Sequence, residues 1–121
     1  KKYLTETDIF VLPSFYREGV PRSALEALAT GCAIITTNNF GCNQTVINKF
    51  NGFKISLDTN NVSFNLAKKI ISLVENKKLL EKFKNNTQIL SKKFDVEDVN
   101  YKMIHAINNI NKLRYFVNKY P

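Results

Sequence analysis

Two short apolar runs on either side of a helical segment constrain the fold of this chain more than any other feature. Residues 9–12 (IFVL) and 33–37 (AIITT) are continuous apolar or β-branched stretches, typical of strands buried on both faces of a parallel sheet. Between them, Pro21 suits a first helical position and Gly31 a C-terminal cap. A strand, a helix and a strand in this order predict a right-handed crossover, so both strands end at the same edge of the sheet.

The rest of the chain predicts one more strand and a series of helices. The turn signal Asn51-Gly52 precedes a short strand over residues 53–55. Apolar residues then recur at helical spacing, which predicts helices over about residues 62–74, 77–91 and 95–112. We therefore expect an α/β fold class: part of a Rossmann-like parallel-sheet domain, with residues 1–60 as its strand-and-helix part and residues 61–121 as a helical tail. Because three short strands are few for an independent sheet, a fragment of a larger domain is expected.

The charge is concentrated in the second half of the chain. The formal net charge is +8, and residues 51–121 carry thirteen Lys or Arg against six Asp or Glu. Such a basic half suits peripheral association with an anionic membrane surface, although Lys, Asn and Ile share A/T-rich codons and genome composition alone gives the same bias. Nucleic acid is not expected as a partner, because no motif of interleaved aromatic and basic residues is present.

Cysteine and histidine content points away from a metal centre. Cys32, Cys42 and the single histidine, His105, form no metal-ligand pattern, and His105 is expected to be a surface or packing residue. No apolar run approaches the roughly 18 residues that span a bilayer, and no signal peptide is recognised. Together with two lone thiols, these observations predict a cytoplasmic protein, with the inner face of the membrane as its site of association.

The segment EGVPRSALE, residues 18–26, carries the candidate site. A helix that begins beside the end of a strand directs its free N–H groups toward the sheet edge, which suits a phosphate or diphosphate. Gly19 leaves the backbone accessible, Ser23 adds a hydroxyl, and Arg22 can grip either a phosphate or only a neighbouring carboxylate. The segments expected around one cleft are Glu18, Gly19, residues 36–39 and Gly41.

The two glutamates of this segment suggest a ligand with two ends. Glu26 lies among small and apolar neighbours, and a carboxylate suits the vicinal hydroxyls of a ribose. Eight residues of helix would separate Glu18 and Glu26 by about 12 Å, near the span of a nucleotide-sugar. The alternative is that Glu26 is the solvent-facing residue of an amphipathic helix and Glu18 a loop charge, and spacing alone leaves both open.

The surrounding sequence resembles a known family. Residues 10–37 (FVLPSFYREGVPRSALEALATGCAIITT) strongly resemble family 4 (group 1) glycosyltransferases of the GT-B fold, in particular bacterial enzymes that build capsule, O-antigen or lipid-linked oligosaccharides. Gly41-Cys42 and residues 51–53 resemble later landmarks of the family, so the resemblance covers about residues 8–56. In place of the acidic residue that many relatives carry after the glycine loop, this chain has Gln44-Thr45.

The resemblance implies a role for each residue of the segment. Glu18 would be the catalytic residue that contacts the donor sugar near the reacting carbon, and Glu26 would hold the ribose hydroxyls. The residues implied to lie along the sugar hydroxyls and the diphosphate are Gly19, Val20, Pro21, Arg22 and Ser23.

The resemblance also implies the reaction. Family members transfer a sugar with retention from a nucleotide-sugar, here expected to be a UDP-sugar, to a saccharide or lipid-linked acceptor. No metal or other cofactor is expected, and the chain has no Asp-x-Asp motif. The N-terminal GT-B domain, which holds the acceptor and a catalytic-site histidine, has no counterpart in these residues, so the chain alone is expected to be inactive. Two alternatives remain: a non-catalytic, nucleotide-sugar-binding remnant of a truncated glycosyltransferase, and a phosphorylase-like nucleotide-binding protein that uses no sugar.

Overall fold

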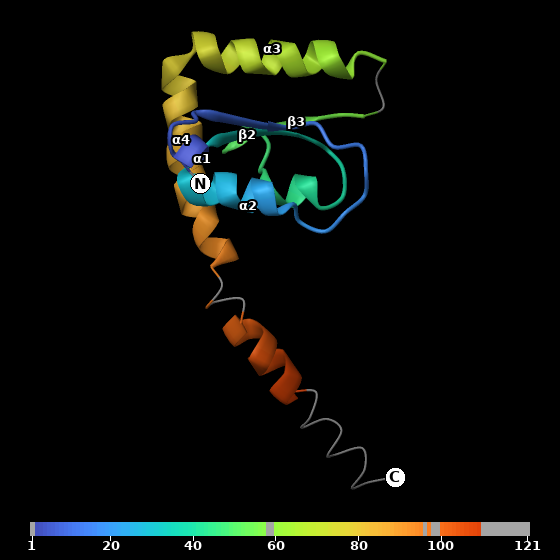
Figure 1. The fold of residues 1–121 in the computed structure, drawn as a ribbon, viewed down its shortest axis with the longest axis vertical. Coiled ribbons are helices and arrows are strands. Elements are labelled where there is room, and N and C mark those ends of the chain that lie inside the picture. The colour runs from blue at the N-terminus through green and yellow to red at the C-terminus, as the bar shows by residue number, and fades with distance from the viewer. Residues whose placement is uncertain (1, 58–59, 96, 98–99, 110–121) are drawn as a thin grey trace, which may run out of the picture. The chain divides into compact units, whose positions relative to one another are not determined.

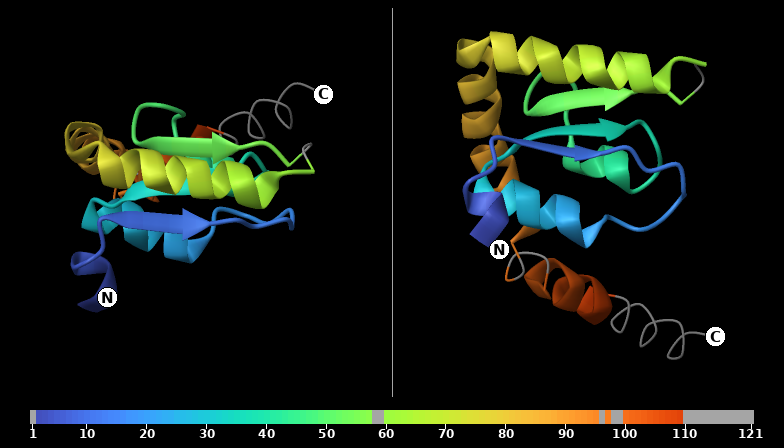
Figure 2. Two further views of the ribbon diagram at one scale, coloured as in Figure 1. Left: turned by 90° about the horizontal axis from the view of Figure 1, so that it is seen from above. Right: turned by 45° about the horizontal axis from the view of Figure 1, so that its top comes forward.

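A parallel sheet forms the centre of residues 1–91. The computed structural model describes residues 2–57, 60–95, 97 and 100–109, and within them the strands are β1 (Ile9–Leu12), β2 (Ala33–Thr37) and β3 (Gly52–Ile55), in the order β1-β2-β3. Leu12 pairs with Thr36 and Thr37 with Ile55, and all strand directions agree (Figure 2). The parallel arrangement predicted from the strand-helix-strand order is confirmed.

Helices cover both faces of this sheet. Within residues 1–91 the described α-helices are α1 (Lys2–Thr5), α2 (Arg22–Thr30), α3 (Val62–Glu75) and α4 (Lys77–Ser91). Short 3-10 turns are η1 (Cys42–Thr45) and, beyond residue 91, η2 (Lys92–Phe94). Figure 1 shows α2 and α3 on opposite faces, while α4 runs past the amino ends of the strands. Residues 1–91 form one compact unit and residues 92–121 a second. In the second unit, residues 97 and 100–109 of the predicted helix 95–112 are helical, whereas residues 96, 98–99 and 110–112 lie outside the described residues.

The ends of α2 set the direction in which it meets the sheet edge. Pro21 was expected at the first helical position, but it is the N-cap, with ψ 129° in the extended region. Its carbonyl accepts hydrogen bonds from the N–H groups of Ala24 and Leu25 at 3.1 Å, so the helix ladder starts one residue later than predicted. At the other end, Gly31 takes φ 78° and closes the helix as predicted, because its N–H donates to the carbonyl of Leu28.

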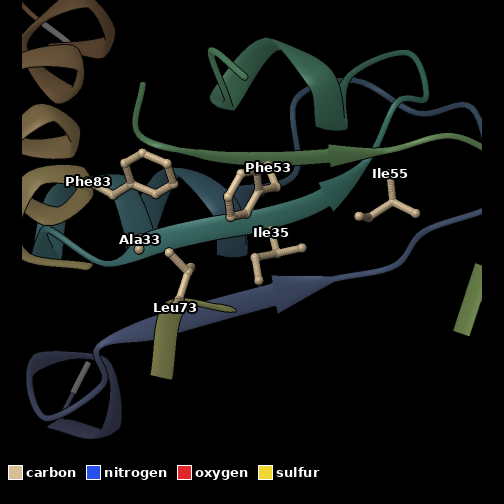
Figure 3. Close-up of a cluster of buried hydrophobic side chains, with 6 residues drawn as sticks. All are labelled: Ala33, Ile35, Phe53, Ile55, Leu73 and Phe83. Atoms are coloured by element: carbon tan, nitrogen blue, oxygen red, sulfur yellow. The ribbon is translucent and has the colours of Figure 1, made fainter. Parts of the chain in front are cut away.

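The main hydrophobic core lies between the sheet and helices α3 and α4. Its buried members are shown in Figure 3: Ala33, Ile35, Phe53, Ile55, Leu73 and Phe83. The rings of Phe53 and Phe83 meet edge to face with centroids 5.2 Å apart, an arrangement that adds to the burial of both. On the opposite face, Ile34 is buried on the side of α2, where Ala24 and Ala27 allow close packing.

Helix α4 is attached to the loops that precede the strands. The Nζ of Lys84 donates to Asp8 Oδ1 at 2.8 Å, and this hydrogen bond, aided by the charge of Asp8, raises the pKa of Lys84 despite some desolvation. Two residues further along the helix, Asn86 Nδ2 donates to the Phe50 carbonyl at 2.7 Å. These contacts hold the amino edge of the sheet and leave the carboxyl edge to the loops.

Asn51 and Gly52 do more than form a turn. Asn51 is fully buried, and its side chain accepts from the N–H of Ile47 at 2.7 Å and donates to the Thr45 carbonyl at 3.1 Å. Gly52 lies so close to β2 that an added Cβ would overlap the carbonyl oxygen of Ile34. The pair therefore fixes the register and the close approach of β3 to β2.

This close approach predicts that Gly52→Ala is strongly destabilising. Separating β2 from β3 to accommodate a methyl group should cost about 2–3 kcal/mol. Urea unfolding followed by circular dichroism measures the change, with Gly19→Ala as the control, because an added Cβ at Gly19 meets no atom within 4 Å. Equal unfolding midpoints for both variants would contradict the packing described for β3.

Candidate functional site

Two loops meet at the carboxyl edge of the sheet. Residues 13–21 follow β1 and residues 38–41 follow β2, and ligands of open α/β sheets bind at this edge. Thr36 and Thr37, which were predicted to face the cleft, are buried at this edge. Their hydroxyls donate to the carbonyls of Leu12 and Ser14, so they hold the chain where it leaves β1.

Gly41 brings the two loops into direct contact. Its φ is 85°, and an added Cβ would overlap the carbonyl oxygens of Glu18 and Gly19. The predicted proximity of these three residues is therefore confirmed. Only glycine combines this backbone conformation with such a close approach, so Gly41 sets the position of the Glu18 loop.

A hollow lies where the loops meet. Its volume is about 450 Å³, and it is lined by Arg17, Glu18 and Phe40. Phe40 is 58% exposed, so an apolar ring borders the hollow together with the carboxylate. No sequence motif singles out Arg17 or Phe40, although both lie in loops that follow predicted strands.

Glu18 is exposed at this hollow, and one neighbour orients it. The hydroxyl of Ser14 donates to Glu18 Oε1 at 3.2 Å, which uses one of the two carboxylate oxygens. Beside it, the space around Gly19 is open, whereas Val20 is half-buried and Pro21 buried. The chain thus passes from an accessible backbone at Gly19 into the packed start of α2.

The start of α2 is open to an anion. Pro21 forms no side-chain cap, and the first helical N–H to bond within the helix is that of Ala24. The N–H groups of Arg22 and Ser23 precede that bond, and both residues are exposed. Free N–H groups and the helix dipole together favour negative charge at such a terminus.

Glu26 lies one turn further along α2 and pairs with Arg22. Arg22 Nε is 3.4 Å from Glu26 Oε1, and the two side chains are 93% and 43% exposed. An exposed pair of this kind contributes only about 0.3–0.5 kcal/mol, so a ligand can displace it at little cost. Arg22 therefore contacts the neighbouring carboxylate, one of the two roles left open by the sequence.

The prediction that an unbroken helix joins Glu18 to Glu26 is wrong. Because Pro21 is extended and α2 begins at Arg22, residues 18–21 are not helical, and the helical part up to Glu26 covers only about 6 Å. The estimate of about 12 Å had assumed an unbroken helix over eight residues.

The second loop contains a polar group without a visible partner. The Oδ1 of Asn39 accepts from the N–H of Phe40 at 2.9 Å, while its buried Nδ2 has no hydrogen-bond partner within the described part of the chain. An unpaired buried donor costs roughly 1–3 kcal/mol, so a ligand or water is expected there. Thr45, by contrast, is buried and donates to the Cys42 carbonyl at 2.8 Å, which makes it a structural residue of η1.

The described residues contain no group of three or more His, Cys, Asp or Glu side chains suited to hold a metal ion. Cys32 and Cys42 are buried free thiols. Among the helices that the structure describes, none is long and apolar enough to cross a bilayer.

The contact between the loops predicts that Gly41→Ala displaces the Glu18 loop. NMR amide shifts of Glu18 and Gly19 should change, while those of β1 to β3 stay close to the wild-type values. Gly31→Ala is the matched control, because Gly31 also has a positive φ but an added Cβ there meets only the side chain of Gln88, at 3.1 Å. Gly31→Ala should lose about 1 kcal/mol of stability from its positive φ, and Gly41→Ala about 2–3 kcal/mol, because its Cβ would also overlap backbone carbonyl oxygens. Unchanged shifts at Glu18 in Gly41→Ala would show that the loops do not depend on this contact.

The chain is similar in sequence to known glycosyltransferases. A family model described as "Glycosyl transferases group 1" matches residues 1–90. Over 76 residues the chain is 43% identical to the N,N'-diacetylbacillosaminyl-diphospho-undecaprenol alpha-1,3-N-acetylgalactosaminyltransferase of Campylobacter jejuni, covering 63% of this chain and 19% of that protein. Over 55 residues it is 47% identical to the UDP-Gal:alpha-D-GlcNAc-diphosphoundecaprenol alpha-1,3-galactosyltransferase of Escherichia coli, covering 46% of this chain and 14% of that protein. The chain thus spans less than a fifth of each curated relative.

Solved structures are similar over most of the chain. The Anabaena protein HepE in complex with UDP-glucose superposes with a TM-score of 0.78 at 21% identity, over 89% of this chain and 29% of that one. The C-terminal domain of a group 1 glycosyl transferase family protein from Francisella tularensis gives a TM-score of 0.65 at 27% identity, over 78% of this chain and 47% of that one. These similarities confirm the predicted fold class, part of a Rossmann-like domain of the GT-B type followed by helices.

Proposed function

Because this chain belongs to the group 1 glycosyltransferases, we propose that it binds the donor substrate in a retaining enzyme of cell-surface glycan biosynthesis. In this proposal the enzyme transfers a sugar from a UDP-sugar to a polysaccharide or lipid-linked saccharide acceptor. Since the chain spans less than a fifth of its curated relatives, we assign it only one part of the reaction, which is the binding of the donor. Turnover would then require the N-terminal GT-B domain, and the chain alone would be inactive.

The observation that carries the proposal is the open start of α2 at the carboxyl edge, with Glu18 before it and Glu26 within it. We assign the diphosphate to the N–H groups of Arg22 and Ser23, where the helix dipole would stabilise the negative charge of the leaving group. The backbone over residues 19–21 would follow the diphosphate and the sugar hydroxyls, because the space beside Gly19 is open.

The two carboxylates would then have separate roles. Glu26 would accept hydrogen bonds from the ribose hydroxyls, and Arg22, released from the exposed 3.4 Å pair, would turn to the diphosphate. Glu18, which lines the hollow and is oriented by Ser14, would contact the transferred sugar near its reacting carbon. In this scheme no metal ion is needed, because helix dipole and basic side chains meet the charge on the phosphates.

The choice of donor and acceptor is supported by the named relatives. The Escherichia coli relative uses UDP-Gal, and HepE was solved with UDP-glucose. Both curated relatives are named for diphospho-undecaprenol substrates and alpha-1,3 linkages, and an α-linked product from an α-linked nucleotide-sugar corresponds to retention. An acceptor of this kind would place the reaction at a membrane, and we propose the cytoplasmic face.

An NMR titration of the isotope-labelled chain with UDP, GDP and ADP tests the donor site. We expect saturable shifts at residues 19–26 with UDP. Glu26→Ala should weaken binding about tenfold or more, because hydrogen bonds to a charged carboxylate are lost. Glu75→Ala is the matched control, since Glu75 is an exposed glutamate at the end of α3. No saturable shift with any nucleotide, or equal losses in both variants, would contradict the proposed site.

Glu18 is tested separately, in a full-length enzyme that contains this chain. Glu18→Ala should lower kcat by about a hundredfold or more while nucleotide affinity changes little, because its contact is with the reacting sugar. Initial rates of sugar transfer at saturating donor measure kcat. A variant that transfers sugar at the wild-type rate would exclude this role.

A further inference from the structure

The apolar arc of helix α3 is wider than the side that packs against the sheet. One side, which includes Leu66, Ile70 and Leu73, packs against the core of the sheet. The other side is exposed and consists of Phe64, Ala67, Ile71 and Val74, which we call the outer α3 face. Phe64, Ile71 and Val74 are 68%, 53% and 59% exposed. A helix whose apolar arc extends beyond its core-facing side is expected to be covered over the whole arc.

The outer α3 face is hollowed and borders a basic hollow. The hollow over the face has a volume of about 420 Å³ and includes Phe64, Ile71 and Lys68. Lys68 also lines a second hollow of about 260 Å³, together with Lys54 and Lys69. We call this second one the basic hollow, because no carboxylate is among the described residues that line it. Among the described residues that line the hollow over the outer α3 face, the acidic one is Glu75, at the far end of α3.

The basic hollow lies beside the carboxyl edge of the sheet, where the donor site is proposed. It includes Ile55, at the carboxyl end of β3, and the Ile55 carbonyl accepts a hydrogen bond from the N–H of Asn38 at 2.8 Å. Asn38 begins the loop that contains Phe40, and Phe40 lines the hollow beside Glu18, which we call the donor hollow. The basic hollow and the proposed donor site are therefore joined through one strand-end contact.

We propose that the outer α3 face and the basic hollow dock the protein on an anionic phospholipid bilayer. Phe64 and Ile71 would enter the interface between headgroups and acyl chains, while Lys54, Lys68 and Lys69 would bind lipid phosphates. The formal charge of +8 favours an anionic surface over a second copy of the same chain, which would bring equal charge. This inference rests on the proposed function for its membrane, since a lipid-linked acceptor lies in a bilayer, but it uses no residue of the donor site.

Cosedimentation of the 121-residue chain with vesicles tests the surface. We expect binding to vesicles of phosphatidylglycerol and phosphatidylcholine in equal parts, little binding to phosphatidylcholine alone, and weaker binding as salt is raised. Replacing Phe64→Ser and Ile71→Ser together should reduce the partition coefficient about tenfold. Lys68→Gln should reduce it about fivefold.

Two variants outside the proposed surface are the controls. Ile89→Ser removes an apolar side chain that is 61% exposed on α4, and Lys49→Gln removes an exposed positive charge in the loop before β3. Both should bind vesicles like the wild type, and circular dichroism should show every variant folded. No binding to anionic vesicles, or equal losses in the controls, would overturn the inference. So would a dimer in sedimentation velocity that Phe64→Ser dissociates.

The proposals for the donor site and for the docking surface can be refuted independently of each other. The NMR shifts with UDP should be unchanged in the Phe64 and Ile71 double variant, and Glu26→Ala should bind vesicles normally. If UDP binding is absent but the vesicle pattern holds, only the donor-site proposal falls. If UDP binds as expected and vesicles do not, only the docking surface falls.

Discussion

The burial of β2 between two parallel neighbours is the constraint on which the candidate site depends. All five residues of β2 are buried, and the strand is held on one side by the close approach of Gly52. On the other side, the hydroxyls of Thr36 and Thr37 reach the chain that leaves β1. Since parallel strands end at one edge, this pairing brings the loops of Glu18 and Gly41 into contact. The site is thus built on rigid strand ends, although its residues lie in loops.

The sequence predicted the elements well because their signals are local. The apolar runs of β1 and β2, the glycine that ends α2, and the helical spacing in α3 and α4 each lie within one segment. What it did not predict depends on contacts between segments. Pro21 is extended because the chain must turn from the Glu18 loop into α2, and Phe40 reaches the hollow only because Gly41 packs against that loop. Neither follows from the periodicity of a single segment.

The roles of the site residues are implied by the family resemblance. The structure adds how Arg22 and Glu26 are paired before a ligand binds. Arg22 and Glu26 neutralise each other on an exposed helix face, at 3.4 Å. The cost of separating them is small, because both ends are solvated and gain little from the pair. A diphosphate at the helix start and a ribose at Glu26 would each replace one half of this pair. The same two side chains would then bind opposite ends of one ligand without moving the backbone.

The distribution of charge connects the proposed donor site to the proposed docking surface. Residues 1–50, which build the donor edge, carry five Lys or Arg against four Asp or Glu, so the excess of +7 belongs to the rest of the chain. Within the first compact unit, Lys54, Lys68 and Lys69 gather at the carboxyl end of β3, which is paired with the end of β2. A bilayer held by these lysines would lie beside the edge from which the donor hollow opens. A sugar on the donor and a saccharide on a lipid diphosphate would then meet over a short distance, because both ligands approach the same end of the sheet.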